Sequence, residues 1–371
     1  MGTSALVPLF MQMTDGINFL AAGFGSRVRD ALNSQKSFKG GAHDIETLKR
    51  VYDELAEKSG AKFTFCTKVI GVKASEGKID CAICSGLGGI FAVKAKVFID
   101  ATGNGDLAYM AGAKYEKGSL CSTWCSIDWQ KWRKNRPDMP QPQSFKVKEA
   151  YEAGVFSFYD PHMTGIFEIG DGLGGGNIGH AFGVDGTDEG SVTRALLHCR
   201  KSMREYKNYY NKYVPGFENA KVVSTGSAMG IRETRRFVGD YTLNIDDYMK
   251  RAVFDDEIGR YAYPIDIHPS SFDKGELERH RQEFDKLYKY AKGESYGIPY
   301  RILTPKGFDN LYTAGRCGSI RVMPACFIMG QAAGIGASMA AGSNASVHEI
   351  DVRTLQGKLV KFGAYLPNFK A

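Results

Sequence analysis

The chain has 371 residues, of which 43% are hydrophobic and 24% are charged, and these proportions exclude a disordered or fibrous protein. The formal net charge is only +7, and the densest basic stretch, residues 130–148, contains three prolines and reads as an exposed connection. We therefore expect no nucleic-acid partner, and a small-molecule substrate of anionic character as the use of the excess positive charge.

The eight cysteines are widely spaced and form no pair of CxxC motifs, so the sequence predicts no metal site. The single CxxC, Cys81 to Cys84, falls in a predicted strand, where residues three apart face opposite sides. The N-terminal run ALVPLFM has no basic residue before it and contains a proline, unlike a signal peptide or a membrane span. A cytoplasmic protein without a membrane partner is the expectation, although a lost upstream segment would leave a signal unseen.

The first third of the chain predicts two helices followed by strands. Residues 1–26 are apolar and small without periodicity, and a short helix is expected at 27–32. A clearer helix covers 44–58, capped by Asp44 and closed by Gly60. Strands follow at 62–74, 78–84 and 89–93 as a small meander, and the apolar run at 96–103 predicts a central parallel strand.

The middle of the chain is aromatic, glycine-broken and irregular. It predicts strands at 165–169 and 220–223, a long helix at 189–213, an acidic helix at 245–251, a strand in YPIDI and a helix at 275–290. A buried strand at 311–314 then leads through a glycine turn into a helix that opens near Met323 and Pro324. An amphipathic helix ends the chain.

Two segments match the dinucleotide-binding pattern G-x-G-x-x-G. The segment 174–179, GGGNIG, is followed by further glycines and cannot open a helix, so we interpret it as a glycine bend entering a strand. GNGDLA, at Gly103 to Ala108, lies between a strand and a helical turn. No second strand ending in an acidic residue follows it, so it predicts a strand-to-loop crossing and not the first unit of a nucleotide fold.

DATGNGDLAYMAGA resembles the ATG motif that closes the FAD-binding region of flavoproteins with two dinucleotide-binding domains, and NLYTAGRC with RVMPACFIMGQAAGIGA resembles their second FAD segment. GIRETRRFVGDYTL, YPIDIH and YGIPYRILTPKGFDNL are similar to substrate-domain signatures of the FAD-dependent oxidoreductases of the FAD_oxidored type. The resemblance covers nearly the whole chain in order. It implies an α/β fold with a glutathione-reductase-like FAD/NAD(P)-binding parallel sheet and β-meander, and an inserted α+β substrate domain.

The implied domains are an FAD-binding part at 1–113, a substrate or cap domain at 114–300 and a C-terminal FAD-binding part at 301–371. The family begins with a strand followed by G-x-G-x-x-G, and this sequence shows no such unit before the loop at Thr3 and Ser4. Two explanations remain open: a truncated N-terminus, which we favour, or a partner that supplies the missing nucleotide-binding unit. A homo-oligomer is a further possibility.

The resemblance implies FAD as cofactor, held where the late helix aims its N-terminus at the flavin. The bland alternative is a tightly packed core helix, and Arg316 has the alternative of capping local carbonyls. The implied cofactor-binding residues are Thr3, Ser4, Thr102, Gly103, Ala314, Gly315, Arg316, Val322, Met323, Pro324 and Ala325.

Flavin chemistry asks the protein for substrate placement and a proton carrier. His268 suits the proton role, and Arg232 with Arg235 suits a carboxylate clamp, with salt bridges to Glu233 or Asp240 as the alternative. Tyr300 and Arg301 follow a proline that fixes the backbone, and Asn177 and His180 are weaker candidates. The expected reaction is hydride transfer between FAD and a small organic substrate. The alternatives are an inactive fragment or a subunit completing a partner's flavin site, and an NAD(P)-dependent reductase using Gly103–Ala108.

Overall fold

The computed structural model describes residues 3–112, 121–136, 138, 142, 145–158, 160, 165–231, 235, 237–266, 290–315 and 318–370. The N-terminal part contains α1 (Phe24–Ser34), the strand pair β1 (Phe38–Lys39) and β2 (Ala42–His43), and α2 (Ile45–Ser59). The predicted cap is confirmed, because the Asp44 carboxylate accepts the Thr47 amide. Gly60 closes α2 with φ of 70°, as predicted.

The meander is a three-stranded antiparallel sheet, β3 (Lys68–Ser75), β4 (Lys78–Gly86) and β5 (Gly89–Val93). Its first strand begins later than the predicted residue 62. Residues 62–67 pair with no strand, and Phe63 and Phe65 are 47% and 72% exposed. The residue pattern at 62–67 was therefore not sufficient to form a strand, because a strand also needs a neighbouring strand to pair with its backbone and side chains.

A parallel pair of strands joins two distant parts of the sequence. β6 (Phe98–Asp100) pairs with β13 (Leu311–Thr313), with Phe98 opposite Leu311 and Asp100 opposite Thr313. The short α3 (Asp106–Met110) follows β6. After β13 come the 3-10 turn η2 (Gly318–Arg321), then α9 (Met323–Ser343) and α10 (Val352–Phe362). The prediction of a parallel strand at the ATG segment is confirmed.

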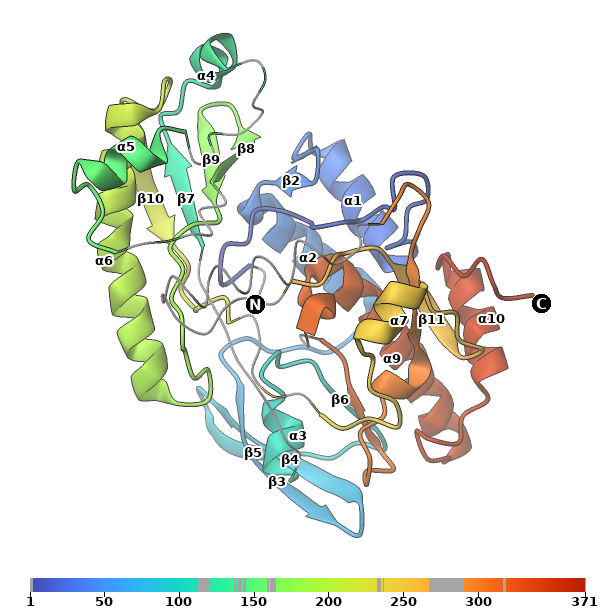
Figure 1. Cartoon of the computed structure of the whole chain (residues 1–371). Coiled ribbons are helices and arrows are strands. Elements are labelled where there is room, and N and C mark those ends of the chain that lie inside the picture. The colour runs from blue at the N-terminus through green and yellow to red at the C-terminus, as the bar shows by residue number, and fades with distance from the viewer. Residues whose placement is uncertain are drawn as a thin grey trace.

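A second layer of structure forms the cap, the upper left part of Figure 1. Its antiparallel sheet has the order β10–β7–β9–β8, from β7 (Ser122–Cys125), β8 (Ile166–Gly170), β9 (Leu173–Gly176) and β10 (Lys221–Thr225). The cap helices are α4 (Trp129–Asn135), α5 (Val147–Glu152) and α6 (Glu189–Tyr213). The glycines at 174–176 lie inside β9, so the rejection of GGGNIG as a nucleotide loop is confirmed.

The cap core is an aromatic cluster in which Trp124, Tyr206 and Phe217 are fully buried. The ring of Trp124 meets the edge of Tyr210 at 5.6 Å, a favourable geometry for two aromatic side chains. Tyr206 and Tyr210 both belong to α6, so this cluster fixes the long helix against the sheet.

The remaining elements pack with α9 and not with the cap. They are α7 (Ile245–Lys250), β11 (Glu257–Tyr261), β12 (Tyr296–Pro299) and the turn η1 (Tyr300–Ile302). β11 and β12 share one hydrophobic cluster with α9, so the division at residue 300 stays a prediction. The strand predicted in YPIDI is wrong: β11 ends at Tyr261, and residues 262–266 pair with no strand. The helix predicted at 275–290 falls outside the described residues, apart from its last residue.

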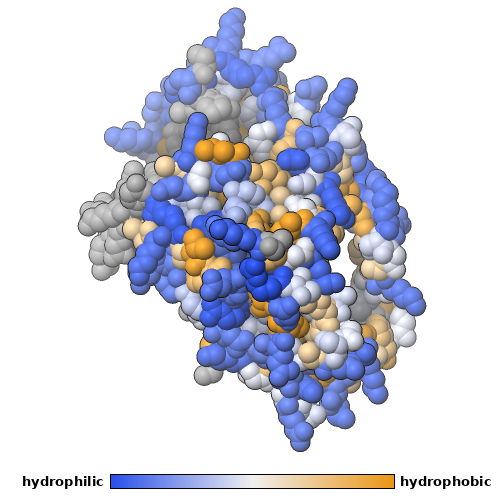
Figure 2. All heavy atoms as spheres, turned by 90° about the vertical axis from the view of Figure 1, so that its right-hand side faces the viewer, coloured by the Kyte–Doolittle hydropathy of each residue, from blue (hydrophilic) through white to orange (hydrophobic). Residues whose placement is uncertain are grey.

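α9 has the length and apolar composition of a membrane-spanning helix, but Ala332, Ala333 and Ala340 are buried in the protein's own core, and Tyr312 lies against Gly336. We therefore interpret α9 as a core helix. On the side of the molecule that carries α10, hydrophilic residues predominate and apolar residues are interspersed among them (Figure 2).

Candidate functional site

Two turns that are more than two hundred residues apart in sequence meet at the carboxyl ends of β6 and β13. The backbone amide of Ala314 donates to the Asp100 carbonyl at 3.0 Å. Because parallel strands end at the same edge of a sheet, the turn with Thr102 and Gly103 lies beside the turn with Ala314 and Gly315. The sequence had placed both pairs in one site, and the structure brings them together.

Asp100 organises the turn after β6 from a position that is 4% exposed. One carboxylate oxygen accepts the amide and hydroxyl of Thr102, at 3.0 and 2.7 Å, and the other accepts the amide of Ala108 at 2.8 Å. The Thr102 hydroxyl in turn accepts the amide of Asp106. Gly103 adopts φ of 80°, a conformation that side chains rarely tolerate. Sequence reasoning did not single out Asp100, although an Asp two residues before a Thr is a recognised turn signal.

The second turn leads to an uncapped helix. Among the described residues, the N-cap residue Val322 makes no capping side-chain hydrogen bond, and Pro324 occupies the first turn of α9. Free amides together with the helix dipole favour a negative or polarised group at this point. Gly315 has φ of 150°, and a Cβ built on it meets nothing within 4 Å, so the turn also leaves space. The body of α9 packs in the core, as the alternative interpretation expected, and the role of its N-terminus at the flavin stays a prediction.

The N-terminal loop lies at the centre of the molecule, between the cap and the α9 region (Figure 1). On the cap side, the Ser4 carbonyl accepts the amide of Ala228 at 3.3 Å and the hydroxyl of Ser227 at 3.2 Å. On the other side, the Tyr261 hydroxyl donates to the Met11 carbonyl at 2.6 Å. The segment that contains Ser4 and Met11 therefore contacts both parts of the fold, and the cofactor role of Thr3 and Ser4 stays a prediction.

Arg235 is tied to the turn after β6. Its Nη1 donates to a carboxylate oxygen of Asp106 at 2.7 Å and to the Asn104 carbonyl at 3.2 Å. Its guanidinium also stacks on the Tyr109 ring at 3.9 Å. The side chain is 7% exposed, so this cation is held close to the predicted cofactor turn. Asp106 is not one of the partners that the sequence suggested, and of those two Glu233 lies outside the described residues.

Tyr300 and Arg301 have other surroundings. The Tyr300 hydroxyl is buried, donates to the Val347 carbonyl at 2.6 Å and shares a hydrogen bond with the Tyr312 hydroxyl, and burial raises its pKa. Arg301 pairs with Asp256 at 2.9 Å, and that carboxylate raises the pKa of the guanidinium. Among the residues that the structure describes, neither side chain hydrogen-bonds to the two turns, and their catalytic roles stay predictions. Arg232, His268 and Arg316 lie outside the described residues.

A buried ionisable cluster in the cap was not anticipated. His180 Nδ1 lies 2.8 Å from an Asp160 carboxylate oxygen, and the Tyr206 hydroxyl donates to the same oxygen at 2.5 Å. Burial, followed by the Asp160 charge, raises the pKa of Tyr206 well above its usual value. The three residues come from separate segments, so no local sequence signal marks the cluster. Nearby, the Cys121 thiol donates to the Asn177 side chain at 3.4 Å.

The model of the FAD dependent oxidoreductase family matches residues 1–359. The chain belongs to this family. Its α/β architecture is that of the FAD/NAD(P)-binding proteins, and FAD is the cofactor that the family implies. No curated protein matches the sequence.

Thirteen chains of known structure match, and two of them are described here. One is a geranylgeranyl bacteriochlorophyll reductase-like protein from Thermoplasma acidophilum, with 14% identity, a TM-score of 0.40, and coverage of 88% of this chain and 61% of that chain. The other is the flavin-dependent brominase Bmp2, as a triple mutant, with 10% identity, a TM-score of 0.37, and coverage of 86% and 60%. The chain thus spans about three fifths of the length of these structures.

The described residues fit the flavin part of FAD. The uncapped first turn of α9 offers amide donors, and the open space beside Gly315 leaves room for a flat ring. Gly103 allows a close backbone approach in the neighbouring turn. These features suit a planar group with a partly negative edge, which the isoalloxazine ring presents.

Proposed function

We propose that this protein transfers a hydride between FAD and a small organic substrate, most consistently an anionic one. The observation that carries the proposal is the parallel pairing of β6 with β13, which sets two glycine turns and the uncapped N-terminus of α9 at one edge. Bound FAD would supply the hydride acceptor or donor. The chain's own part is to hold the ring, exclude water and place charge.

Three groups of the chain support separate parts of the proposed function. The first-turn amides of α9 would stabilise negative charge on the ring, and Thr102 and Gly103 would hold its other side. Arg235 places a cation next to the turn, and its charge would favour an anionic substrate or reduced cofactor. His268 and Arg232 remain the proposed proton carrier and carboxylate clamp.

We also propose that the diphosphate part of FAD is bound by a strand-and-helix unit that docks beside β6. Within the described residues β6 pairs only with β13, so one edge of this parallel strand is free. Nearby apolar side chains are exposed, with Ile99 at 39% on β6 and Phe91 at 44% on β5. A free strand edge with exposed apolar residues is suited to strand pairing.

The test is to purify the chain, incubate it with FAD, remove free flavin by desalting and record the absorbance between about 350 and 500 nm, where bound flavin absorbs. We expect the flavin absorbance band to be retained. A substrate added without oxygen should bleach this band and yield an equal amount of oxidised product. A band that appears only after fusion to a strand-and-helix unit carrying G-x-G-x-x-G supports the docking proposal. Tight NADPH binding without any flavin would overturn the proposed function.

A further inference from the structure

Positive charge is concentrated on one helix of the cap. α6 carries six Lys or Arg residues against two Glu, a net charge of +4 within a chain whose net charge is +7. Twenty-five residues therefore hold more than half of the excess charge of the molecule. Such a concentration creates a local field that the overall composition does not reveal.

The charge lies on one face of α6. The charged positions are related by spacings of three, four, seven and eleven residues, which return to the same side of a helix. Tyr206, Tyr209 and Tyr210 are buried in the cap on the opposite side. The exposed face, called the basic face below, consists of Arg194, Arg200, Lys201, Arg204, Lys207 and Lys212.

Most of these cations have no carboxylate of their own. Among the described residues, only Arg194 reaches one, at 3.7 Å from Asp188. The Glu205 carboxylate is engaged by Ser157, whose amide and hydroxyl donate to it at 2.8 and 2.7 Å. By contrast, the lysines on α2 are paired within their own helix, Lys49 with Glu46 and Lys58 with Glu54. Apart from Arg194, the cations of the basic face thus have no ion pair within the part of the chain that the structure describes.

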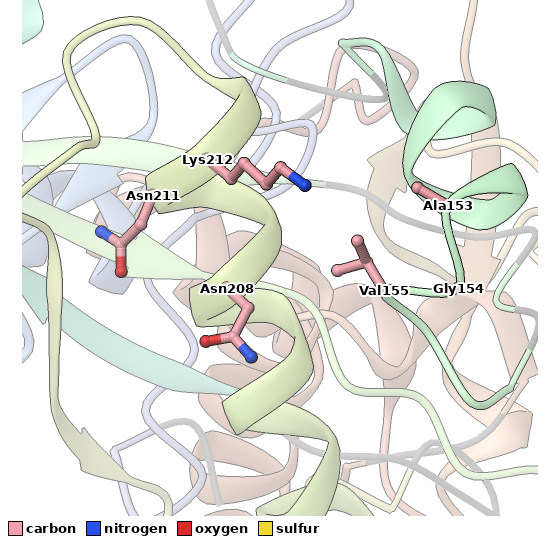
Figure 3. Close-up of a pocket in the computed structure, with 6 residues that line it drawn as sticks. All are labelled: Ala153, Gly154, Val155, Asn208, Asn211 and Lys212. Atoms are coloured by element: carbon pink, nitrogen blue, oxygen red, sulfur yellow. The ribbon is translucent and has the colours of Figure 1, made fainter.

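A groove adjoins the C-terminal end of the basic face (Figure 3). Its volume is about 570 Å³, and it lies between α6 and the segment that follows α5. Figure 3 shows the Lys212 amine reaching toward that segment, near Ala153 and Val155. Asn211 turns its amide to the Phe217 and Ala220 carbonyls, which leaves Asn208 and Lys212 as the polar groups facing a ligand.

We propose that the basic face and its groove bind an acidic polypeptide segment of another protein. The face provides charge over about 27 Å, the length of eighteen residues of helix, and Lys212 with Asn208 suits a carboxylate at the groove end. A bilayer is a poorer fit, because Leu197 is the only large apolar side chain exposed at 62% on this helix, and a flat surface does not enter a groove. A single-stranded nucleic acid is a poorer fit, because no aromatic ring is exposed there for stacking.

The probe is a fluorescein-labelled peptide of about twelve glutamates, long enough to span the face at about 3.3 Å per residue. Its anisotropy is titrated with the full chain at several salt concentrations. The variant K201E/R204E/K207E should bind the peptide about tenfold more weakly, and the difference should shrink as salt rises. K212M should weaken binding by about threefold, because it removes only the charge at the groove.

The matched control is K49E/K58E/K358E, which makes the same change in net charge on exposed residues of α2 and α10. It should keep most of the affinity, and circular dichroism should show that all variants are folded. Equal losses in the two triple variants would overturn the proposal, because the binding would then follow net charge alone. Tighter binding to vesicles with anionic lipid or to an oligothymidylate, abolished by K201E/R204E/K207E, would also overturn it in favour of that ligand.

Discussion

Arg235 and Arg301 are both arginines in ion pairs, but they differ in how closely the fold holds them. The Arg235 side chain is 7% exposed and stacks on Tyr109, whereas the Arg301 side chain is 48% exposed. A surface pair contributes little because water and salt screen it, while a cation held at an inner turn also fixes that turn.

We therefore predict that Arg235→Met lowers the free energy of unfolding by about 2 kcal/mol, because it leaves the Asp106 carboxylate without its cation. Arg301→Met should change it by less than about 1 kcal/mol. Urea unfolding followed by tryptophan fluorescence measures both values. FAD retention should also fall only in the Arg235 variant, and equal effects of the two substitutions would contradict the assignment.

His43 is a buried histidine with an unusual environment. It stacks on Phe10 at 4.2 Å, and among the described residues neither ring nitrogen has a hydrogen-bond partner of good geometry. Burial lowers the pKa of His43 to about 4, and this outweighs the opposing pull of the Gly41 and Val7 carbonyls and the Asp44 charge. The folded protein therefore holds His43 neutral.

The consequence is a loss of stability in acid. Above the unfolded-state pKa of 6.5 both states are neutral at this residue. As the pH falls from 6.5 toward 4, only the unfolded state takes up the proton, so the free energy of unfolding falls, by about 3 kcal/mol at most. We predict that urea unfolding at pH 5 and 7 shows a difference that is smaller in His43→Phe. The same pH dependence in both proteins would contradict this role.

At the scale of elements, β9 shows why a glycine triplet belongs in a strand. A Cβ on Gly174 would lie 2.4 Å from the Ile166 side chain, and one on Gly175 would lie 2.2 Å from Pro8. The glycines thus let side chains of β8 and of the N-terminal loop approach β9 closely. Pro8 belongs to the loop of Thr3 and Ser4, so this contact also positions the candidate cofactor loop.

We predict that Gly175→Val destabilises the protein by about 2 kcal/mol, because the added side chain pushes Pro8 and its loop away from β9. The retained FAD should fall in parallel. Gly88→Ala in the β4–β5 turn is the control, because a Cβ there meets nothing within 4 Å. Thermal unfolding and the flavin absorbance test both effects. An unchanged flavin content in a destabilised Gly175→Val protein would show that the position of this loop does not affect FAD binding.

The sequence predicted several elements well because their signals are local. α6 begins after Asp188, whose side chain accepts the amides of Gly190 and Ser191, and its bounds match the predicted helix. α2 likewise combines a cap, an apolar face and a closing glycine. The start of the strand expected at 62–74 and the strand expected in YPIDI were wrong, because strands depend on partners that lie elsewhere in the chain.

At the scale of the whole molecule, the two proposed binding regions are the candidate flavin site and the basic face of α6. The candidate flavin site lies centrally, where the cap, the N-terminal loop and α9 meet, whereas α6 runs along the outer flank of the cap (Figure 1). A partner bound to the basic face would therefore leave the free edge of β6 available to the nucleotide-binding unit. The two proposed partners occupy different surfaces and are separable by mutation.

The sequence by itself determined the family, the cofactor and the two turns of the candidate flavin site, because these depend on short motifs such as DATG and on glycines in turns. Only the tertiary structure decided which side chains surround them. It paired Arg235 with Asp106, enclosed Tyr300 in the core beside Tyr312, and left all but one of the cations of α6 without an ion pair among the described residues. The physical reason is that ion pairing and burial depend on distances between remote segments, which local patterns do not encode.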